Sequence, residues 1–403
     1  MNTSLANTTT TRQHLLAPSA PDAPFCIYLH IPFCARICPY CDFNRYAHQE
    51  PLIPAYVDAL IGEIALTRAA HGPIRAETIF FGGGTPSLLE PEQVGRIIEA
   101  LRREFDIDPA AEVTLEANPE RLGDGKLDGF RAAGINRISL GVQTQQAHGL
   151  RILGRAHKPE VPERALREAR AAGFDNISLD FIFGWPGQTV EDWQRDIDTM
   201  LAWQPEHLSL YSLIVEPGTP YHEAVRTGKL VPVDDDTTAD LYEMAIDQLG
   251  AAGWQQYEVS NWAREAGLES RHNAIYWRNG EYLGLGAGAH GHISGVRASK
   301  LRLPAKYIAA VNAGRLPLDQ GETIDAPTAM AETMMLGLRL LQDGVSATAF
   351  AARHGRELRD VYTSQIAALE ALDLLHWHGD RLKLTHRGLL LANDVAERFL
   401  PEN

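Results

Sequence analysis

The stretch CARICPYC, residues 34–41, places three of the four cysteines of a 403-residue chain within one short segment. Cys34, Cys38 and Cys41 follow a β-rich run that Pro32 ends. Thiolates clustered in this way, in a chain otherwise poor in cysteine, are typical metal ligands. We therefore predict a metal centre in a loop at the end of the first strand.

Two metal centres are compatible with the C-x3-C-x2-C spacing. A structural zinc site usually has four ligands, often in paired C-x2-C clips. The sequence contains no second clip, although His30 or His48 could complete a Cys3His set. A cubane iron–sulfur cluster normally takes four cysteines, so three would leave one iron for a small molecule with an amine and a carboxylate. We favour the cluster, and we predict that the fourth cysteine, Cys26, is buried filler.

The composition excludes several classes of protein. The chain has 37 Lys+Arg against 52 Asp+Glu, a formal charge of −15, so we expect no nucleic-acid partner. No apolar run approaches the roughly 18–20 residues of a membrane-spanning helix, and the N-terminus lacks a secretory pattern. Four cysteines in so long a chain do not form a disulfide framework, which indicates a reducing cytoplasm.

Strand and helix patterns alternate after a Thr/Ala/Pro-rich tail, residues 1–24, which we predict to be disordered. In segments such as 54–70, apolar residues recur three and four positions apart, as on one face of a helix. This alternation predicts parallel βαβ units. The β-rich runs are 26–31, 78–83, 112–117, 137–142, 177–183 and 207–215.

Polar and glycine-rich residues gather where these runs end. GGGTP (82–86), Glu116, Gln143 and Asp180 all lie at or near predicted carboxyl ends of strands. Because such ends converge on the mouth of a barrel, we predict an α/β fold with a partial (β/α)6, TIM-like barrel rather than a flat sheet.

We predict four segments along the chain. The tail precedes a barrel in residues 25–235, and residues 236–326 flank the barrel. Residues 327–403 are predicted to form a smaller, mainly helical, winged-helix-like domain with a hairpin near 376–385, where His-Gly-Asp marks a turn.

The cysteine motif, the (β/α)6 pattern and GGGTP together resemble the radical S-adenosylmethionine superfamily. YLHIPFC, FGGGTPSLL, TLEANPE, SLGVQ and LDFIFGWPGQT are similar to the oxygen-independent coproporphyrinogen III oxidase family, over residues 25–395. The resemblance implies that Cys34, Cys38 and Cys41 hold a [4Fe–4S] cluster with S-adenosylmethionine on the fourth iron. It also implies an electron donor such as flavodoxin or ferredoxin, and cleavage of the cofactor to methionine and a 5′-deoxyadenosyl radical.

The resemblance further implies a cofactor site. Glycines lack a Cβ atom, so their backbone can approach a ligand closely; the alternative is a plain tight turn. Carboxylates can accept hydrogen bonds from ribose or amino groups, and an arginine can pair with the cofactor carboxylate; the alternative is helix capping. The implied residues are Tyr28, Gly83, Gly84, Thr85, Glu116, Gln143, Arg155 and Asp180.

Two departures separate the chain from the oxidase. Two positions past the third cysteine the oxidase has a further cysteine, whereas this chain has Phe43. The oxidase also has a longer ordered N-terminal segment. Both differences favour a sister group, the HemW-type heme chaperones, which keep the cluster and carry an H-N-x-x-Y-W motif.

This sequence contains the motif as His272, Asn273, Tyr276 and Trp277. A histidine can ligate heme iron axially, and Tyr and Trp offer broad faces to a macrocycle. The preceding Arg271 could pair with a heme propionate. By resemblance we expect these four motif residues to bind heme.

Alternatives remain open at the motif. It could be an ordinary strand edge with buried aromatics and a hydrogen-bonded histidine. His290 and His292, in the glycine-rich segment GLGAGAHGH, are competing candidates for the iron ligand.

The sequence thus predicts a heme chaperone of the radical S-adenosylmethionine type, with heme and heme-acceptor proteins as partners. The resemblance suggests respiratory acceptors and transient contact with a membrane surface. No catalytic residue is assigned, and coproporphyrinogen III oxidase activity is expected to be absent. The rival hypotheses are that oxidase and a zinc-stabilised binding module.

Overall fold

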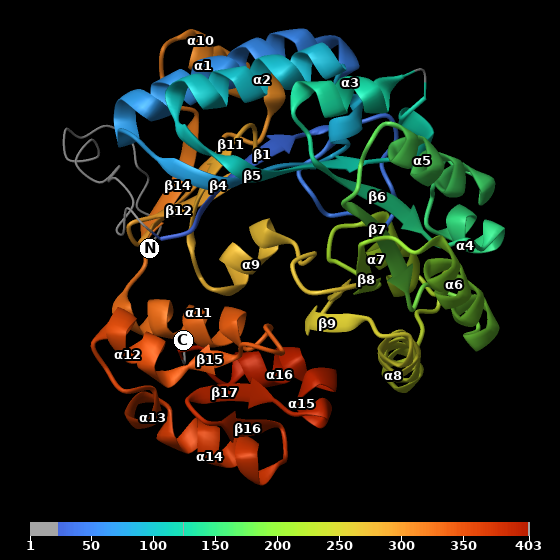
Figure 1. The fold of residues 1–403 in the computed structure, drawn as a ribbon, viewed down its shortest axis with the longest axis vertical. Helices are drawn as coiled ribbons and strands as arrows, with labels where there is room; N and C mark the ends of the chain where they lie inside the picture. Colours follow the sequence, from blue (N-terminus) through green and yellow to red (C-terminus); the bar gives the residue numbers. More distant parts are fainter. Residues whose placement is uncertain (1–22, 124, 402–403) are drawn as a thin grey trace.

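The computed structural model describes residues 23–123 and 125–401. Apart from its last two residues, the predicted disordered tail therefore lies outside the described residues. Figure 1 shows a strongly curved sheet with helices packed on its outer side and a separate, mainly helical body at the C-terminal end.

Six parallel strands form the centre of the sheet in chain order, without a reversal. They are β1 (Phe25–Ile31), β4 (Arg75–Gly83), β5 (Asp106–Ala117), β6 (Arg137–Gln143), β7 (Ile177–Phe183) and β8 (His207–Ser212). Each coincides with a β-rich run of the sequence. A sheet that curves in chain order under a layer of helices is the predicted partial barrel, which is confirmed.

Amphipathic helices cover the outer face of this arc. They include α1 (Ile53–His71), α2 (Pro91–Glu104), α3 (Lys126–Ala133), α4 (Ala147–Ile152), α5 (Glu160–Ala171), α6 (Val190–Trp203) and α8 (Asp235–Ala251). In α2, Val94, Ile97 and Leu101 share one face and are completely buried. The helix begins with a proline, and the preceding Glu90 N–H donates to Gln93 Oε1 at 2.9 Å, which caps its first turn.

Short strands extend both edges of the sheet. β11 (Glu281–Leu285) runs parallel to β1, and β12 (His290–Ile293), β13 (Val296–Lys300) and β14 (Leu318–Thr323) continue it in antiparallel fashion. At the opposite edge, β10 (Asn261–Ala263) lies antiparallel to β8 and to β9 (Gln255–Glu258). Residues 236–326, which we predicted to flank the barrel, thus contribute strands to both edges of the sheet.

The H-N-x-x-Y-W motif lies on a short helix, α9 (Arg271–Trp277), inside the arc of the sheet (Figure 1). Ser270 caps this helix by accepting a hydrogen bond from Asn273 N–H. The alternative of a strand edge is therefore wrong, because Ser270 starts a helix where the aromatic residues suggested a strand.

The C-terminal body has its own hydrophobic cluster, separate from that of the barrel. It contains α11 (Ala326–Gly337), α12 (Ala347–His354) and α14 (Thr363–Ala371), together with a three-stranded sheet. The expected hairpin is confirmed as β16 (Leu375–His378) and β17 (Arg381–Leu384). No helix in the described part of the chain is long and apolar enough to cross a membrane.

Candidate functional site

A cavity of about 550 Å³ opens at the carboxyl ends of the parallel strands. Its walls bring together residues that are as far apart in sequence as Tyr28 and Tyr276. The cavity is lined by all the predicted metal ligands, Cys34, Cys38 and Cys41. It is also lined by all the predicted cofactor residues, Tyr28, Gly83, Gly84, Thr85, Glu116, Gln143, Arg155 and Asp180. Three of the four motif residues, His272, Asn273 and Tyr276, complete the set.

The cysteine loop begins where β2 (Phe33–Cys34) pairs with β3 (Tyr46–Ala47). Cys34 is buried, whereas Cys38 and Cys41 are half-buried. Thr85 Oγ1 donates to Cys34 Sγ at 3.6 Å, and Arg155 Nη1 donates to Cys38 Sγ at 3.7 Å. Donors to sulfur of this kind are typical of the surroundings of iron–sulfur clusters.

Burial decides the protonation of these thiols. It raises the pKa of Cys34 to about 11 and also raises the pKa of Cys41, with repulsion from the neighbouring thiolates adding to both shifts. Without a cation the two thiols therefore stay protonated at neutral pH, and binding of a metal would displace their protons.

The arrangement fits a cluster better than a single ion. In residues 23–123 and 125–401, no three His, Cys, Asp or Glu side chains converge on one metal position. In a cubane each cysteine binds a different iron, so the sulfurs stand further apart than they do around one zinc ion. The three cysteines nevertheless line one cavity and influence one another's ionisation.

The glycines of GGGTP hold the end of β4 against the cysteine loop. Gly83 has a φ of 109°, and a Cβ there would lie 2.6 Å from the His30 ring. Gly84 N–H donates to Ile31 O at 2.8 Å, and a Cβ at Gly84 would lie 2.6 Å from Phe33 O. We predicted that the backbone of these glycines approaches a ligand closely. At Gly84 the backbone instead packs closely against the backbone of Ile31 and Phe33.

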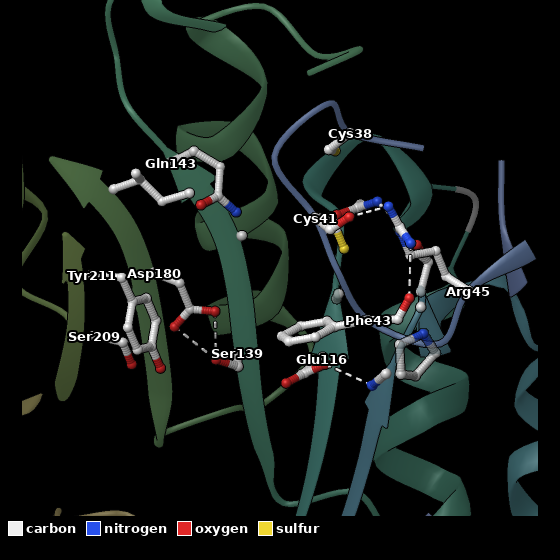
Figure 2. A pocket seen from close by; sticks show the side chains of 18 of the residues that line it. Cys38, Cys41, Phe43, Arg45, Glu116, Ser139, Gln143, Asp180, Ser209 and Tyr211 are labelled. Carbon is white, nitrogen blue, oxygen red and sulfur yellow. Dashed lines mark hydrogen bonds between the residues drawn. The ribbon is translucent and has the colours of Figure 1, made fainter. Parts of the chain in front are cut away.

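Two half-buried carboxyl groups form the floor of the cavity, on β5 and β7, with β6 between them (Figure 2). Glu116 Oε2 accepts from Gly83 N–H at 3.2 Å. Burial, assisted by the charge of Asp180, raises the pKa of Glu116 to about 8. Asp180 accepts from Ser139 Oγ at 2.8 Å, and burial raises the pKa of Asp180 as well. Such a floor is poised to take a cationic ligand, which would favour the carboxylate form of both groups.

Arg155 and Gln143 are two further polar residues in the wall of the first cavity. Arg155 Nη2 donates to Asn118 Oδ1 at 2.6 Å and to Gly141 O at 3.2 Å. Its Nε–H is buried and has no acceptor among the described residues. A Cβ at Gly141 would lie 2.7 Å from Gln143 Nε2, so only glycine leaves room for both polar side chains.

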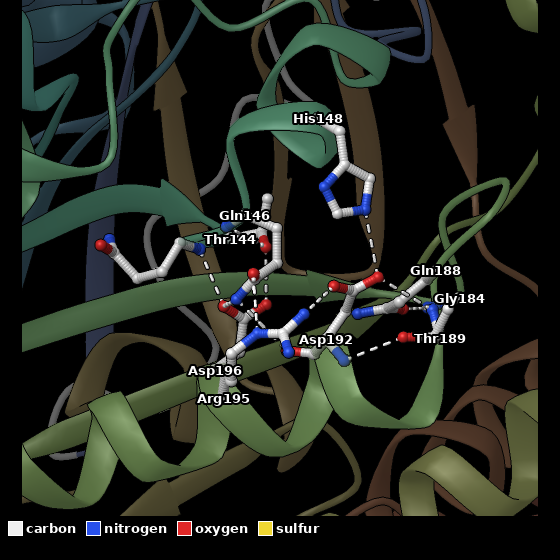
Figure 3. Close-up of polar contacts among 10 residues, drawn as sticks. Thr144, Gln146, His148, Gly184, Gln188, Thr189, Asp192, Arg195 and Asp196 are labelled. Carbon is white, nitrogen blue, oxygen red and sulfur yellow. Dashed lines mark hydrogen bonds and ion pairs between the residues drawn. The ribbon is translucent and has the colours of Figure 1, made fainter.

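Gln143 has a φ of 69°, which is unusual for a residue other than glycine. Figure 3 shows the polar network that supports the following turn. Asp196 of α6 is completely buried and accepts from Thr144 Oγ1 at 2.6 Å, from Gln145 N–H at 2.8 Å and from Gln146 Nε2 at 3.1 Å. Burial raises the pKa of Asp196 to about 6.

Sequence reasoning missed several polar residues of this cavity, among them Asn118 and Ser139. Asn118 lies two residues after Glu116, within the quoted segment TLEANPE. Ser139 is four residues before Gln143 on the same strand, and therefore on the same face of the sheet. The alternation along RISLGVQ was the signal that could have identified Ser139.

His272 is buried at the inner wall of the cavity. Its Nδ1 is 2.7 Å from Thr78 Oγ1, and its Nε2 is 2.9 Å from Tyr276 Oη. Burial lowers the pKa of His272 to about 3, so the ring is neutral. Both ring nitrogens are occupied by hydrogen bonds. Arg271, on the outer side of α9, pairs with Glu77 at 3.5 Å and lines neither of the cavities described here.

Trp277 lines a second cavity, of about 840 Å³, which adjoins the first. Tyr28, Phe43, Glu116 and Tyr276 belong to the walls of both cavities. The fourth residue of the motif is therefore separated from the cysteine triad, but it stays close to Tyr276.

Fold and site define a radical S-adenosylmethionine protein. Residues 28–200 match the radical SAM superfamily, and residues 324–391 match the HemN C-terminal domain. The superfamily implies a [4Fe–4S] cluster and S-adenosylmethionine as cofactors. The solved structure of coproporphyrinogen III oxidase (HemN) from Escherichia coli, a radical SAM enzyme, covers 98% of this chain and 93% of its own, with a TM-score of 0.84. Its sequence identity is 23%, so this likeness shows the fold alone.

Relatives of known name specify the group further. A heme chaperone HemW from Bacillus subtilis is 40% identical over 376 residues, which span 93% of this chain and 99% of the relative. The Escherichia coli heme chaperone HemW is 35% identical, over 94% of this chain and 99% of its own. The chain belongs to the HemW family of heme chaperones, and the oxidase alternative is not favoured.

Proposed function

We propose that this chain binds heme and transfers it to acceptor proteins. The chain would also carry a [4Fe–4S] cluster and S-adenosylmethionine. The observation that carries the proposal is the position of α9, which presents Tyr276 and Trp277 to two adjoining cavities, one of them containing the cysteine triad. Aromatic faces of this kind pack well against a flat macrocycle. Relatives named heme chaperone HemW match nearly the whole chain and support the same function.

Cys34, Cys38 and Cys41 would hold the cluster, each thiolate on a different iron. Thr85 and Arg155 would donate hydrogen bonds to its sulfur ligands, as they do to the free thiols. When bound, cluster and S-adenosylmethionine supply one-electron reductive cleavage. We propose that a flavodoxin or ferredoxin delivers the electron.

The remaining cavity residues would hold S-adenosylmethionine. Glu116 and Asp180 would face its cationic groups as carboxylates, and the unpaired Nε–H of Arg155 would bind its carboxylate. Gln143 would supply both a donor and an acceptor. The proposed set is Tyr28, Gly83, Gly84, Thr85, Glu116, Gln143, Arg155 and Asp180.

Asn273, Tyr276 and Trp277 would contact heme together with His272. Iron ligation by His272 would require loss of its hydrogen bond to Thr78 or to Tyr276. The same two bonds suit a second role, in which a neutral His272 fixes the ring of Tyr276 against the cavity.

We further propose cytoplasmic action, because all four cysteines are free thiols, as a reducing compartment maintains them. Ile37, Phe43 and Ile214 are exposed apolar side chains at the mouth of the first cavity, with 41%, 59% and 61% of their surface accessible. They offer a docking surface to a protein partner. The acceptors would be respiratory proteins, reached by transient contact with a membrane surface.

Anaerobic heme titration tests the function. The reconstituted protein should shift the Soret band of heme, and Trp277→Leu should weaken binding, while Trp377→Leu in the C-terminal body serves as a matched control. An unshifted band with the unmodified protein would contradict heme binding. The same preparation should contain about four irons per chain; zinc in their place would refute the cluster. Turnover of coproporphyrinogen III would instead support the oxidase.

A further inference from the structure

A second cavity adjoins the proposed cluster and cofactor site, and Tyr28, Gly83 and Glu116 line both. Its volume of about 840 Å³ lies within the range of roughly 300–1,000 Å³ that is typical of small-molecule and cofactor sites. It lies between strands β12, β13 and β14 and helices α9 and α11, and it shares Tyr28, Phe43 and Tyr276 with the first cavity. A ligand here would therefore lie directly beside the cluster site.

Two histidines of β12 line this cavity from one face of the strand. His290 and His292 are two residues apart, so their side chains project to the same side. Neither imidazole has a hydrogen-bond partner among the described residues, and His290 is exposed. Burial, together with the charges of Arg297 and Arg302, lowers the pKa of His290, so its ring is neutral and able to bind a metal at neutral pH.

His290 differs in this respect from the other histidine at the cavities. His272 has hydrogen bonds at both ring nitrogens and is 1% exposed, so none of its lone pairs is open. An iron ligand needs an uncommitted nitrogen that faces an open space. His290 meets both requirements without any rearrangement of the chain.

The same walls carry polar groups suited to carboxylates. Arg302 is exposed and has no carboxylate partner in the part of the chain that the structure describes, whereas Lys300 pairs with Glu63 at 2.9 Å. The indole N–H of Trp277 is buried and finds no acceptor within the same residues. Arg302 Nε donates to Asn44 Oδ1 at 3.5 Å. Its charge is balanced by no carboxylate, so this arginine and the unpaired indole N–H are suitable donors to a propionate.

Apolar and aromatic surface completes the cavity. Tyr276 and Tyr282 pack edge to face with their ring centroids 4.8 Å apart, and Met335 and Leu336 of α11 lie on the opposite side. A planar, hydrophobic ligand with peripheral carboxylates and a central metal ion matches these features together: a metal-ligating imidazole, two donors and aromatic walls.

We propose that this second cavity is the heme site that the proposed function requires, with His290 as the axial ligand of the iron and with Arg302 and the Trp277 indole as donors to the propionates. The inference rests on the proposed function, and it moves iron ligation from the motif helix to β12. Of the four motif residues, only Tyr276 and Trp277 line this cavity and would contact heme in it. His272 then acts through Tyr276 as a positioning residue.

The test compares heme with metal-free protoporphyrin on the full reconstituted protein. His290→Gly should weaken heme binding by about tenfold or more and alter the Soret band, because it removes a metal ligand. It should leave protoporphyrin binding unchanged, because that ring has no iron to ligate. Added imidazole should restore the Soret band of His290→Gly. Arg302→Gln should weaken both ligands.

Controls separate this inference from the function. The distant His378→Gly should keep the unmodified Soret band, and circular dichroism verifies that each variant is folded. Two outcomes would overturn the inference but not the function, provided that the unmodified protein binds heme. One is an unchanged heme spectrum in His290→Gly. The other is loss of the Soret band in His292→Gly or His272→Ala while His290→Gly keeps it. Failure of the unmodified protein to bind heme would overturn the proposed function.

Discussion

Binding of S-adenosylmethionine should release a proton from Glu116. This carboxyl group is half-buried in the floor of the first cavity, where burial and the neighbouring Asp180 raise its pKa to about 8. At pH 7 about nine-tenths of the free protein therefore carries a protonated Glu116. A ligand with a sulfonium cation favours the carboxylate and lowers this pKa, so the proton leaves on binding.

The size of the effect follows from these values. Close to 0.9 proton per bound ligand should come from Glu116 at pH 7, and only about 0.1 at pH 9, where the free group is already ionised. Because the bound state requires the carboxylate, this group should make affinity rise with pH, by about tenfold between pH 7 and pH 9. The ligand's own amine adds a separate contribution.

Isothermal titration calorimetry can isolate the Glu116 proton. Titrations of the anaerobic, reconstituted protein at pH 7 in buffers of different ionisation enthalpy give the number of protons released. Glu116→Gln retains the shape of the side chain but not its proton, and protons from the ligand's amine are common to both proteins. A difference of about 0.9 proton is expected. Equal proton release by the two proteins would show that Glu116 does not ionise on binding and would refute this account of the cavity floor.

Three further perturbations have expected outcomes. The pKa of Asp196 is raised to about 6 in the folded chain, so the protonated group stabilises the fold fully below pH 4. This contribution, up to about 3 kcal/mol, is lost as the pH rises through 6. Urea unfolding across this range should show the loss, and Asp196→Asn should give a flatter pH profile. Gly84→Ala should lower the free energy of unfolding by about 1–3 kcal/mol and lower the iron content, because its Cβ would lie 2.6 Å from the backbone oxygen of Phe33. Gly250→Ala is the control: a Cβ there meets no atom within 4 Å, so neither quantity should fall. Thr78→Val should destabilise the fold by about 1–3 kcal/mol by leaving Nδ1 of the buried His272 unpaired, and a melting temperature equal to that of the unmodified protein would contradict that cost.

Much of the barrel could be predicted because local pattern and global fold agree there. Each β-rich run of the sequence became a central strand, since strands buried on both faces are continuous apolar segments. The strand-end rule also predicts that Glu116, Gln143 and Asp180 lie close together, and the three residues line one cavity. Parallel strands fix which ends meet, so chemistry at those ends can be inferred without knowing side-chain contacts.

The second cavity and the motif helix could not be predicted in the same way. β12 and β13 are short and partly polar, so nothing in their pattern reveals that they extend the sheet beyond β1. The helical state of the motif depends on one capping residue, Ser270, among aromatic residues that favour strands. The hydrogen bonds of His272 join residues 194 positions apart, and such tertiary contacts leave no local signal.

The wall shared by the two cavities has a thermodynamic consequence. Because Tyr28, Phe43 and Tyr276 face both spaces, a molecule in one cavity restricts the side-chain conformations available to a molecule in the other. Any factor by which the cofactor changes affinity for the cargo must equal the factor by which the cargo changes affinity for the cofactor. A heterotropic coupling between loading and release would then be reciprocal, and these shared aromatic rings would carry it.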